Sequence, residues 1–148
     1  MTNYERTAAW LMACGKEPTA ANLSVQIGCH IEEFIELLGT LDFASPNDQK
    51  IVSAVMAELN YVSKNLKTRT SLARIRIDQR EQALDALCDG EVTGNGIAFL
   101  AAFDKISADE AVLNANDAKL VDGKPVILEG GKIGKPEGWT PPDLSAFV

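Results

Sequence analysis

Apolar side chains recur every three or four positions along much of the chain, which is the spacing of one face of an α-helix. The pattern is strongest over residues 19–41, where Thr19 is a suitable N-cap. We therefore predict an amphipathic helix here. Its apolar face consists of Leu23, Ile27, Ile31, Phe34, Leu38 and Leu41.

Two further helices are predicted beside this one. Residues Asn3 to Cys14 form a short helical pattern that ends at Gly15 and is followed by Pro18. Ser45-Pro46 begins another helix, because serine caps the first turn and proline fits the first helical position. The apolar face of that helix consists of Ile51, Val52, Val55, Met56, Leu59, Val62 and Leu66.

A fourth helical pattern begins near Asp78 and runs toward Phe103. Glycine costs roughly 1 kcal/mol against alanine inside a helix, so the glycines of its second half suggest a place of close approach. A wider base pocket and close packing in an oligomer are both consistent with them. These glycines are Gly90, Gly94 and Gly96.

The last part of the chain changes in composition. Ser107 and Glu110 form a capping box, which predicts a fifth, short helix over Ala108 to Leu120. Residues 121–148 hold five of the eleven glycines and four of the six prolines, which predicts an irregular tail with a small hairpin around 129–132. We expect this tail to pack on the body or on a partner subunit. The predicted fold is a single all-α domain over 1–148, a bundle of four to five helices.

The charge of the chain limits its partners. Its 21 acidic residues against 14 Lys and Arg give a net charge of −7, which repels polymeric nucleic acid. A nucleoside triphosphate is repelled as well, unless divalent cations lie between its phosphates and the carboxylates of the protein. For a phosphorylated ligand, the composition therefore indicates a metal.

Other residue types narrow the chemistry further. The single histidine, His30, excludes a site of several histidines, and the widely spaced Cys14, Cys29 and Cys88 are interpreted as buried free thiols. No apolar stretch reaches the roughly 18 residues that span a membrane, and the N-terminus lacks the basic start of a secretory signal. We expect a cytoplasmic protein whose chemistry depends on carboxylates.

A cluster of carboxylates lies beside the apolar face of the helix over 19–41. Glu33 and Glu36 are one helical turn apart, and Glu32 is adjacent. Like charges at this spacing destabilise a helix by a few tenths of a kcal/mol, so the cluster needs a cause. One cause is a solvated surface, and the other is a bound divalent cation.

A second acidic pair lies on the fourth helix. Asp85 and Asp89 are one turn apart, and Glu81 lies a further turn back on the same side. Apolar neighbours indicate that this helix is largely buried, where carboxylates are costly unless they are paired or bind a metal. If this helix packs against the helix over 19–41, the two sets of oxygen donors suit Mg²⁺ or Mn²⁺.

These residues resemble the all-α nucleoside triphosphate pyrophosphohydrolases of the MazG and phosphoribosyl-ATP pyrophosphohydrolase type. That family has Glu-Glu-x-x-Glu on one helix, which residues 32–36 match, and an acidic pair on a later helix, which Asp85 and Asp89 match loosely. The resemblance continues through the Asn-x-x-Lys of Asn116 and Lys119, and through the tail to Leu144, as in the phage and bacterial branch. It covers roughly residues 22–144.

The resemblance implies a role for each of these residues. Two or more Mg²⁺ or Mn²⁺ ions would be held by Glu33, Glu36, Asp85 and Asp89 or Glu81, and Glu32 or Glu36 would orient or deprotonate the attacking water. Phosphate oxygens would be held by Asn116 and Lys119. The alternative for Lys119 is a cation that complements the end of a helix dipole.

Recognition of the base is less defined by the sequence. Asn22, Gln26 and His30 precede the acids on the same helix and could read base edges, and Trp10 could stack on a base. Each of these residues could equally serve packing.

The phage branch implies cleavage of a purine deoxynucleoside triphosphate to the monophosphate, with dGTP the first expectation and dATP the second. The enzymatic alternatives are a housecleaning NTPase and a dUTP or dCTP pyrophosphatase. A non-catalytic helical interaction domain is the alternative outside enzymes. The family also implies a homo-dimer or homo-tetramer.

Overall fold

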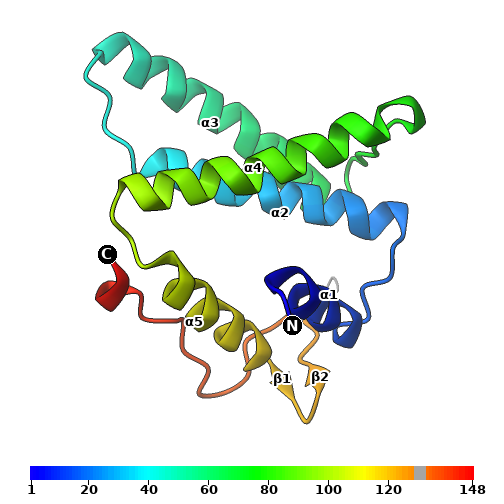
Figure 1. Cartoon of the computed structure of the whole chain (residues 1–148). Coiled ribbons are helices and arrows are strands. Elements are labelled where there is room, and N and C mark those ends of the chain that lie inside the picture. The colour runs from blue at the N-terminus through cyan, green and yellow to red at the C-terminus, as the bar shows by residue number, and fades with distance from the viewer. Residues whose placement is uncertain (129–132) are drawn as a thin grey trace. The chain divides into compact units, whose positions relative to one another are not determined.

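The computed structural model describes residues 1–128 and 133–148 and confirms the all-α class (Figure 1). The described residues form five α-helices, short 3-10 turns and one two-stranded sheet. They are α1 (Asn3–Ala13), α2 (Ala20–Gly39), α3 (Pro46–Lys67), η1 (Ile77–Gln79), α4 (Arg80–Leu100), α5 (Lys105–Asp117), β1 (Leu120–Val121), β2 (Lys124–Pro125) and η3 (Ser145–Phe147). The hairpin predicted around Glu129-Gly130-Gly131-Lys132 lies outside the described residues.

The chain divides into two compact units. The hairpin unit, Pro18–Arg74, contains α2 and α3. The second unit combines Met1–Glu17 with Ile75–Val148, so it contains α1, α4, α5 and the tail. The single domain that the sequence predicts stays a prediction, and each unit is described by itself. None of the described helices is long and apolar enough to cross a membrane.

The helices of the hairpin unit begin where their caps predict. The Thr19 side chain accepts a hydrogen bond from the Asn22 amide at 3.2 Å, and the Ser45 side chain accepts one from the Asp48 amide at 3.2 Å. Pro46 occupies the first helical turn, where its missing N–H costs nothing. Both starts confirm the sequence prediction.

A close approach joins α2 to α3 at Gly28. The Ser63 hydroxyl donates to the Gly28 carbonyl at 2.8 Å, and Gly28 and Ser63 are both buried. A Cβ on Gly28 would lie 2.9 Å from the Ser63 carbonyl oxygen and 3.0 Å from Leu66 Cβ. The absence of a side chain at Gly28 is therefore what lets the two helices pack at this point.

Polar contacts fasten α1 to α5 in the second unit. Arg6 pairs with Asp117 at 2.6 Å and also donates to the Asn114 side chain. The Trp10 indole N–H donates to the Asn116 carbonyl at 2.8 Å. In the tail, the Trp139 indole N–H donates to the Ala115 carbonyl at 2.7 Å. The expected packing of the tail on the body is thus seen along α5.

The start of α5 corrects the sequence prediction. Asp104, not Ser107, is the N-cap: its carboxylate accepts from the Ser107 amide at 3.1 Å, which makes Ser107 the third residue of the helix. Aspartate and serine are about equally good caps, so the Ser-x-x-Glu pattern did not decide between them. The helix also ends earlier than predicted, at Asp117, and Leu120 begins β1.

The helix α4 differs from its prediction in two respects. It is continuous through Gly90, Gly94 and Gly96, and a Cβ on any of these would meet nothing within 4 Å, so the expected close approach is not found there. Its side chains are also more exposed than predicted, since Leu84 and Leu87 are 64% and 59% exposed. The buried apolar residues among those described are Cys14, Leu66 and Ala98.

The cysteines follow the prediction only in part. All three are free thiols, as predicted, but only Cys14 is buried, while Cys29 is half-buried and Cys88 is exposed on α4. Burial raises the pKa of the Cys14 thiol, which keeps it protonated and inert.

The contact at Gly28 predicts a destabilised hairpin unit when a methyl group is added. Gly28→Ala should lower the free energy of unfolding by about 1–3 kcal/mol, because the new Cβ meets the Ser63 backbone and not a flexible side chain. Gly90→Ala is the matched control, because the site is open and alanine is about 1 kcal/mol better in a helix. Urea unfolding followed by circular dichroism measures both, and equal effects would contradict the packing role of Gly28.

Candidate functional site

The carboxylates of Glu-Glu-x-x-Glu lie on α2 beside the end of α3. Glu33 and Glu36 are exposed, whereas Glu32 is half-buried and forms an ion pair with Lys67 of the last turn of α3. Lys67 Cγ lies 3.0 Å from the position that a Cβ on Gly28 would take, so the lysine stem passes over Gly28 on its way to Glu32. No local pattern in the sequence predicts this cation, because the contact depends on how two helices cross.

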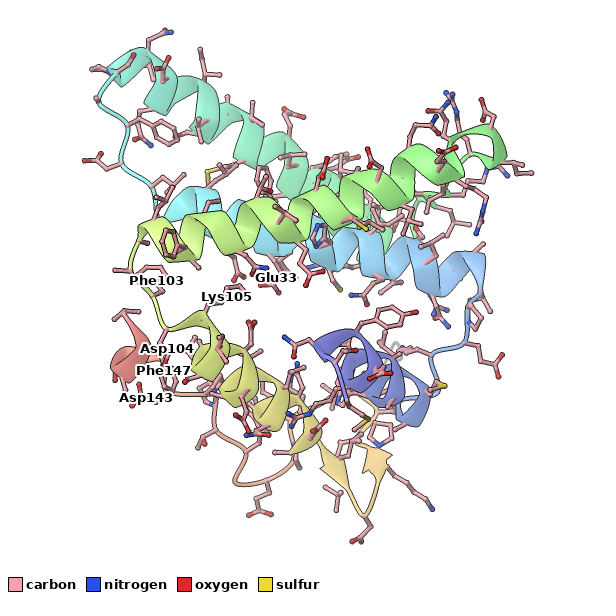
Figure 2. The ribbon with its side chains drawn as sticks, in the orientation of Figure 1. Glu33, Phe103, Asp104, Lys105, Asp143 and Phe147 are labelled. Atoms are coloured by element: carbon pink, nitrogen blue, oxygen red, sulfur yellow. The ribbon has the colours of Figure 1, made fainter. Side chains whose placement is uncertain are left out.

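The charges of this face make Glu33 harder to ionise. Desolvation raises the pKa of Glu33, and the neighbouring charges of Glu36 and Glu32 raise it further. Lys67 and His30 act in the opposite direction without cancelling the effect. Figure 2 shows the Glu33 side chain on α2. A divalent cation at this face would relieve the repulsion, and oxygen donors are the ligands that Mg²⁺ and Mn²⁺ prefer.

The second half of the predicted metal site lies on α4, in the second unit. Asp85 and Asp89 are one turn apart and exposed, and so is Glu81. The burial that the sequence predicted for these carboxylates is therefore not found. In the described part of each unit, no group of three or more His, Cys, Asp and Glu side chains is arranged to hold a metal ion. A site that combines both acidic pairs stays a prediction.

The two predicted phosphate-binding residues lie together in the second unit. The Lys119 ammonium donates to the Asn116 side chain at 2.8 Å. It also lies over two indole rings, 5.9 Å from the centre of Trp10 and 5.3 Å from that of Trp139. Lys135 lies 4.7 Å from the centre of the Trp139 ring. Lys119 thus joins α1, the end of α5 and the tail through cation–π contacts, a structural role that sequence reasoning missed.

The residues expected to read the base are divided between the units. Asn22, Gln26 and His30 share one face of α2. Gln26 and His30 are exposed, and the side-chain oxygen of Asn22 accepts a hydrogen bond from Arg69 at 3.3 Å. Trp10 is in the second unit, with its indole N–H on the Asn116 carbonyl and its ring beneath Lys119. In the second unit, Trp10 therefore has packing partners of its own.

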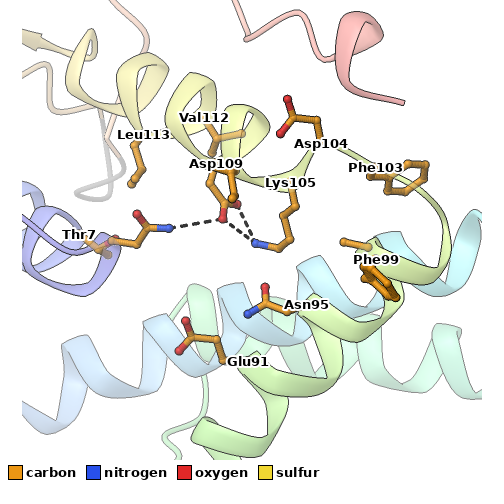
Figure 3. A pocket seen from close by; sticks show the side chains of 13 residues that line it. Thr7, Glu91, Asn95, Phe99, Phe103, Asp104, Lys105, Asp109, Val112 and Leu113 are labelled. Carbon is orange, nitrogen blue, oxygen red and sulfur yellow. Dashed lines mark hydrogen bonds and ion pairs between the residues drawn. The ribbon is translucent and has the colours of Figure 1, made fainter.

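A groove of about 610 Å³ lies in the second unit, and sequence reasoning did not identify it (Figure 3). It is formed by α1, α4, α5 and the turn before α5. In Figure 3, Phe99 and Phe103 lie at one end of the groove, and Thr7 and Leu113 lie at the other. Its lining is Asn3, Thr7, Glu91, Asn95, Ala98, Phe99, Phe103, Asp104, Lys105, Ile106, Asp109, Val112 and Leu113.

Comparison of the chain with protein-family models, with curated proteins and with solved structures finds no match. The resemblance to the all-α pyrophosphohydrolases therefore depends on the motifs themselves, above all on Glu32-Glu33-x-x-Glu36.

The raised pKa of Glu33 predicts a change in stability when its charge is removed. Without divalent cations at neutral pH, Glu33→Gln should stabilise the hairpin unit by about 0.2–0.5 kcal/mol, because one like-charge pair on the helix is lost. A raised pKa means that ionisation opposes folding, so the gain should disappear as the pH falls and Glu33 takes up its proton.

Thermal unfolding between pH 3 and pH 8 measures this effect, with Glu58→Gln on α3 as the control. Mg²⁺ should stabilise the wild type more than the Glu33→Gln variant, since the ion binds the folded carboxylates. A gain in stability that does not depend on pH would show that the ionisation of Glu33 is not the cause.

Proposed function

We propose that the chain is a metal-dependent pyrophosphohydrolase of nucleoside triphosphates. The observation that carries this proposal is the acidic face of α2, where Glu32, Glu33 and Glu36 gather and the ionisation of Glu33 is opposed by desolvation and by the charges of its neighbours. A protein of net charge −7 that maintains such a cluster is suited to a ligand brought in with divalent cations.

In the proposed reaction, the carboxylates bind the metal ions and accept a proton. Glu33 and Glu36, with Asp85 and Asp89 or Glu81 of α4, would hold two or more Mg²⁺ or Mn²⁺ ions. Such ions supply charge neutralisation and a lowered pKa for the attacking water. Glu36 accepts the proton that this water loses as its oxygen attacks phosphorus. The bond to the leaving phosphate oxygen breaks, and the products are a nucleoside monophosphate and pyrophosphate.

Glu32 has a different role, because it already forms an ion pair with Lys67. Its ion pair with Lys67 positions the lysine ammonium at the edge of the acidic face. Lys67 has three N–H donors, so it can bind a phosphate oxygen while it keeps its contact with Glu32. We therefore propose Lys67 as a further phosphate-binding residue, in addition to Asn116 and Lys119.

The proposed substrate is a purine deoxynucleoside triphosphate, dGTP first and dATP second, which fits a cytoplasmic enzyme that remodels the nucleotide pool of a phage-infected host. The likeness of the tail to the phage branch supports it. A housecleaning NTPase and a dUTP or dCTP pyrophosphatase would use the same acidic face with another base.

A non-catalytic helical interaction domain is the second candidate function. The exposure of α4 favours it, because large apolar side chains and the carboxylates Asp85 and Asp89 share this exposed helix. The same exposed apolar surface supports assembly into a homo-dimer or homo-tetramer, which would cover it. The exposed apolar residues of α4 are Leu84, Leu87, Val92, Ile97, Phe99 and Leu100.

The direct test is incubation of the purified protein with each common dNTP and NTP in Mg²⁺ or Mn²⁺, followed by ion-exchange separation of the nucleotides. We expect a deoxynucleoside monophosphate and pyrophosphate to appear, with dGTP consumed fastest. Glu36→Gln should lower kcat by about 10²–10⁴-fold, the usual contribution of a general base. Glu58→Gln should leave it unchanged. If no triphosphate is consumed with either metal, the interaction domain becomes the better account.

Lys67 provides a separate prediction. Lys67→Met keeps the stem that crosses Gly28 but removes the charge, so it should raise KM for the triphosphate about tenfold or more by loss of a charge-assisted contact. Lys67→Arg should restore part of the affinity. Lys64→Met, one turn earlier on α3, is the matched control. Equal KM values for the Lys67→Met and Lys64→Met variants would remove Lys67 from the site.

A further inference from the structure

The groove of the second unit is bounded by helices. Its volume is about 610 Å³, and the residues that line it lie on α1, α4, α5 and the turn between α4 and α5. On α4 the lining runs from Glu91 to Phe99, a distance of roughly 12 Å along the helix axis. The groove is therefore long enough to hold about two turns of a further helix. All of its lining belongs to one compact unit of the chain.

Three large apolar side chains that line the groove are exposed. Phe99 is 82% exposed, Phe103 48% and Ile106 86%. Figure 3 shows Phe99 and Phe103 together at one end of the groove. Exposed apolar side chains that gather at a cavity mark a surface that another molecule covers.

The charge of the lining limits which molecule can cover it. The carboxylates of Glu91, Asp104 and Asp109 line the groove with the ammonium of Lys105, so negative charge is in excess. Lys105 donates to both carboxylate oxygens of Asp109, at 2.8 and 2.7 Å. Hydrogen bonds from Ser107 lower the pKa of Asp104, so that carboxylate stays ionised at neutral pH. The groove therefore attracts basic side chains and repels acidic or phosphorylated ones.

Glu91 and Asn95 are the polar side chains that α4 offers to an occupant. They are one turn apart, on the side of the groove opposite Lys105 and Asp109 (Figure 3). In the described part of the chain, neither side chain makes a hydrogen bond. The Glu91 carboxylate can therefore accept a charge-assisted hydrogen bond from a lysine or arginine of the occupant.

The backbone around the groove determines the form of the occupant. None of the lining residues belongs to a strand, and the helices use their own backbone groups internally. An extended peptide would find no sheet edge to pair with, so its backbone N–H and C=O groups would be left unpaired at the apolar end. A helix pairs these groups within itself, and an amphipathic helix also presents one apolar face.

The same charge disfavours two other occupants. Symmetric pairing of two copies of the chain would place this patch on both sides of the contact, so the carboxylates of one groove would face those of the other. The anionic headgroups of a membrane would be repelled in the same way. A basic helix of another protein has the complementary charge.

We propose that this groove is the docking site for a basic amphipathic helix of a partner protein. Apolar side chains of that helix cover Phe99, Phe103 and Ile106. A lysine or arginine of the helix pairs with Glu91, about two turns away from the side chain that covers Phe99. This inference goes beyond the proposed function and does not depend on the cleavage of triphosphates.

The test uses two synthetic helical peptides of about 14 residues, four turns each. Both have leucines along one face, and their flanking positions are lysines in one peptide and glutamates in the other. Each is titrated into the ¹⁵N-labelled full chain and followed by NMR chemical shifts. We expect the lysine peptide to bind about tenfold or more tightly than the glutamate peptide, with shifts at the lining residues of α4 and α5.

Matched variants test the two parts of the site. Glu91→Lys should weaken binding of the lysine peptide about tenfold or more, whereas Glu110→Lys, on α5 outside the groove, changes the net charge equally and should have little effect. Ile106→Ser should also weaken binding, because it removes an apolar contact. Val92→Ser is its control, since Val92 is exposed on α4 outside the groove.

The proposal is overturned by equal affinities for the two peptides, by equal losses in Glu91→Lys and Glu110→Lys, or by shifts outside the groove. Light scattering without peptide tests a second copy as occupant. If Ile106→Ser but not Val92→Ser dissociates an assembly of the chain, a second copy covers the groove and the proposal fails. Sedimentation with vesicles of anionic lipid tests a membrane in the same way. Circular dichroism confirms that each variant is folded.

Discussion

The contact at Gly28 is the constraint on which the acidic face depends. Because Gly28 has no side chain, the Ser63 carbonyl and the stem of Lys67 both lie within 3.0 Å of where its Cβ would be. The stem continues across this gap to Glu32, where the ammonium pairs with the carboxylate. Close packing of α2 on α3 and the balance of charge around Glu33 therefore have one origin, and a change in the first alters the second.

The second unit is held in a different way, through polar and aromatic contacts and very little buried apolar surface. Arg6 with Asp117, and Lys119 between Trp10 and Trp139, join segments that are far apart in the sequence. The π face of a tryptophan ring attracts the lysine ammonium, and the ammonium stays partly hydrated in this contact. Such a contact therefore tolerates exposure to water that an apolar core does not. This explains how a tail rich in glycine and proline stays on α5.

The sequence predicted the helices well where a local signal marks their ends, and the site less well. Thr19, Ser45 and Pro46 act within one helical turn, so the sequence predicted these helix starts correctly. At α5, both Asp104 and Ser107 were suitable N-caps, and the sequence did not distinguish them. The hairpin at Asp122-Gly123 was not predicted, although it has a local signal, because two successive residues with positive φ favour Asp-Gly in a two-residue turn.

The pairing of Lys67 with Glu32 had no local signal, since it depends on the crossing of two helices. The groove of the second unit had none either, because its walls come from α1 and from residues 91–113, which are far apart in the sequence.

The two acidic regions of the chain differ in the partner that their surroundings allow. On α2, Glu33 and Glu36 are exposed neighbours that repel one another, and a small, doubly charged cation with free coordination positions relieves that repulsion best. In the second unit, the Lys105 ammonium already donates to both carboxylate oxygens of Asp109, so the charge of that carboxylate is balanced without a metal ion.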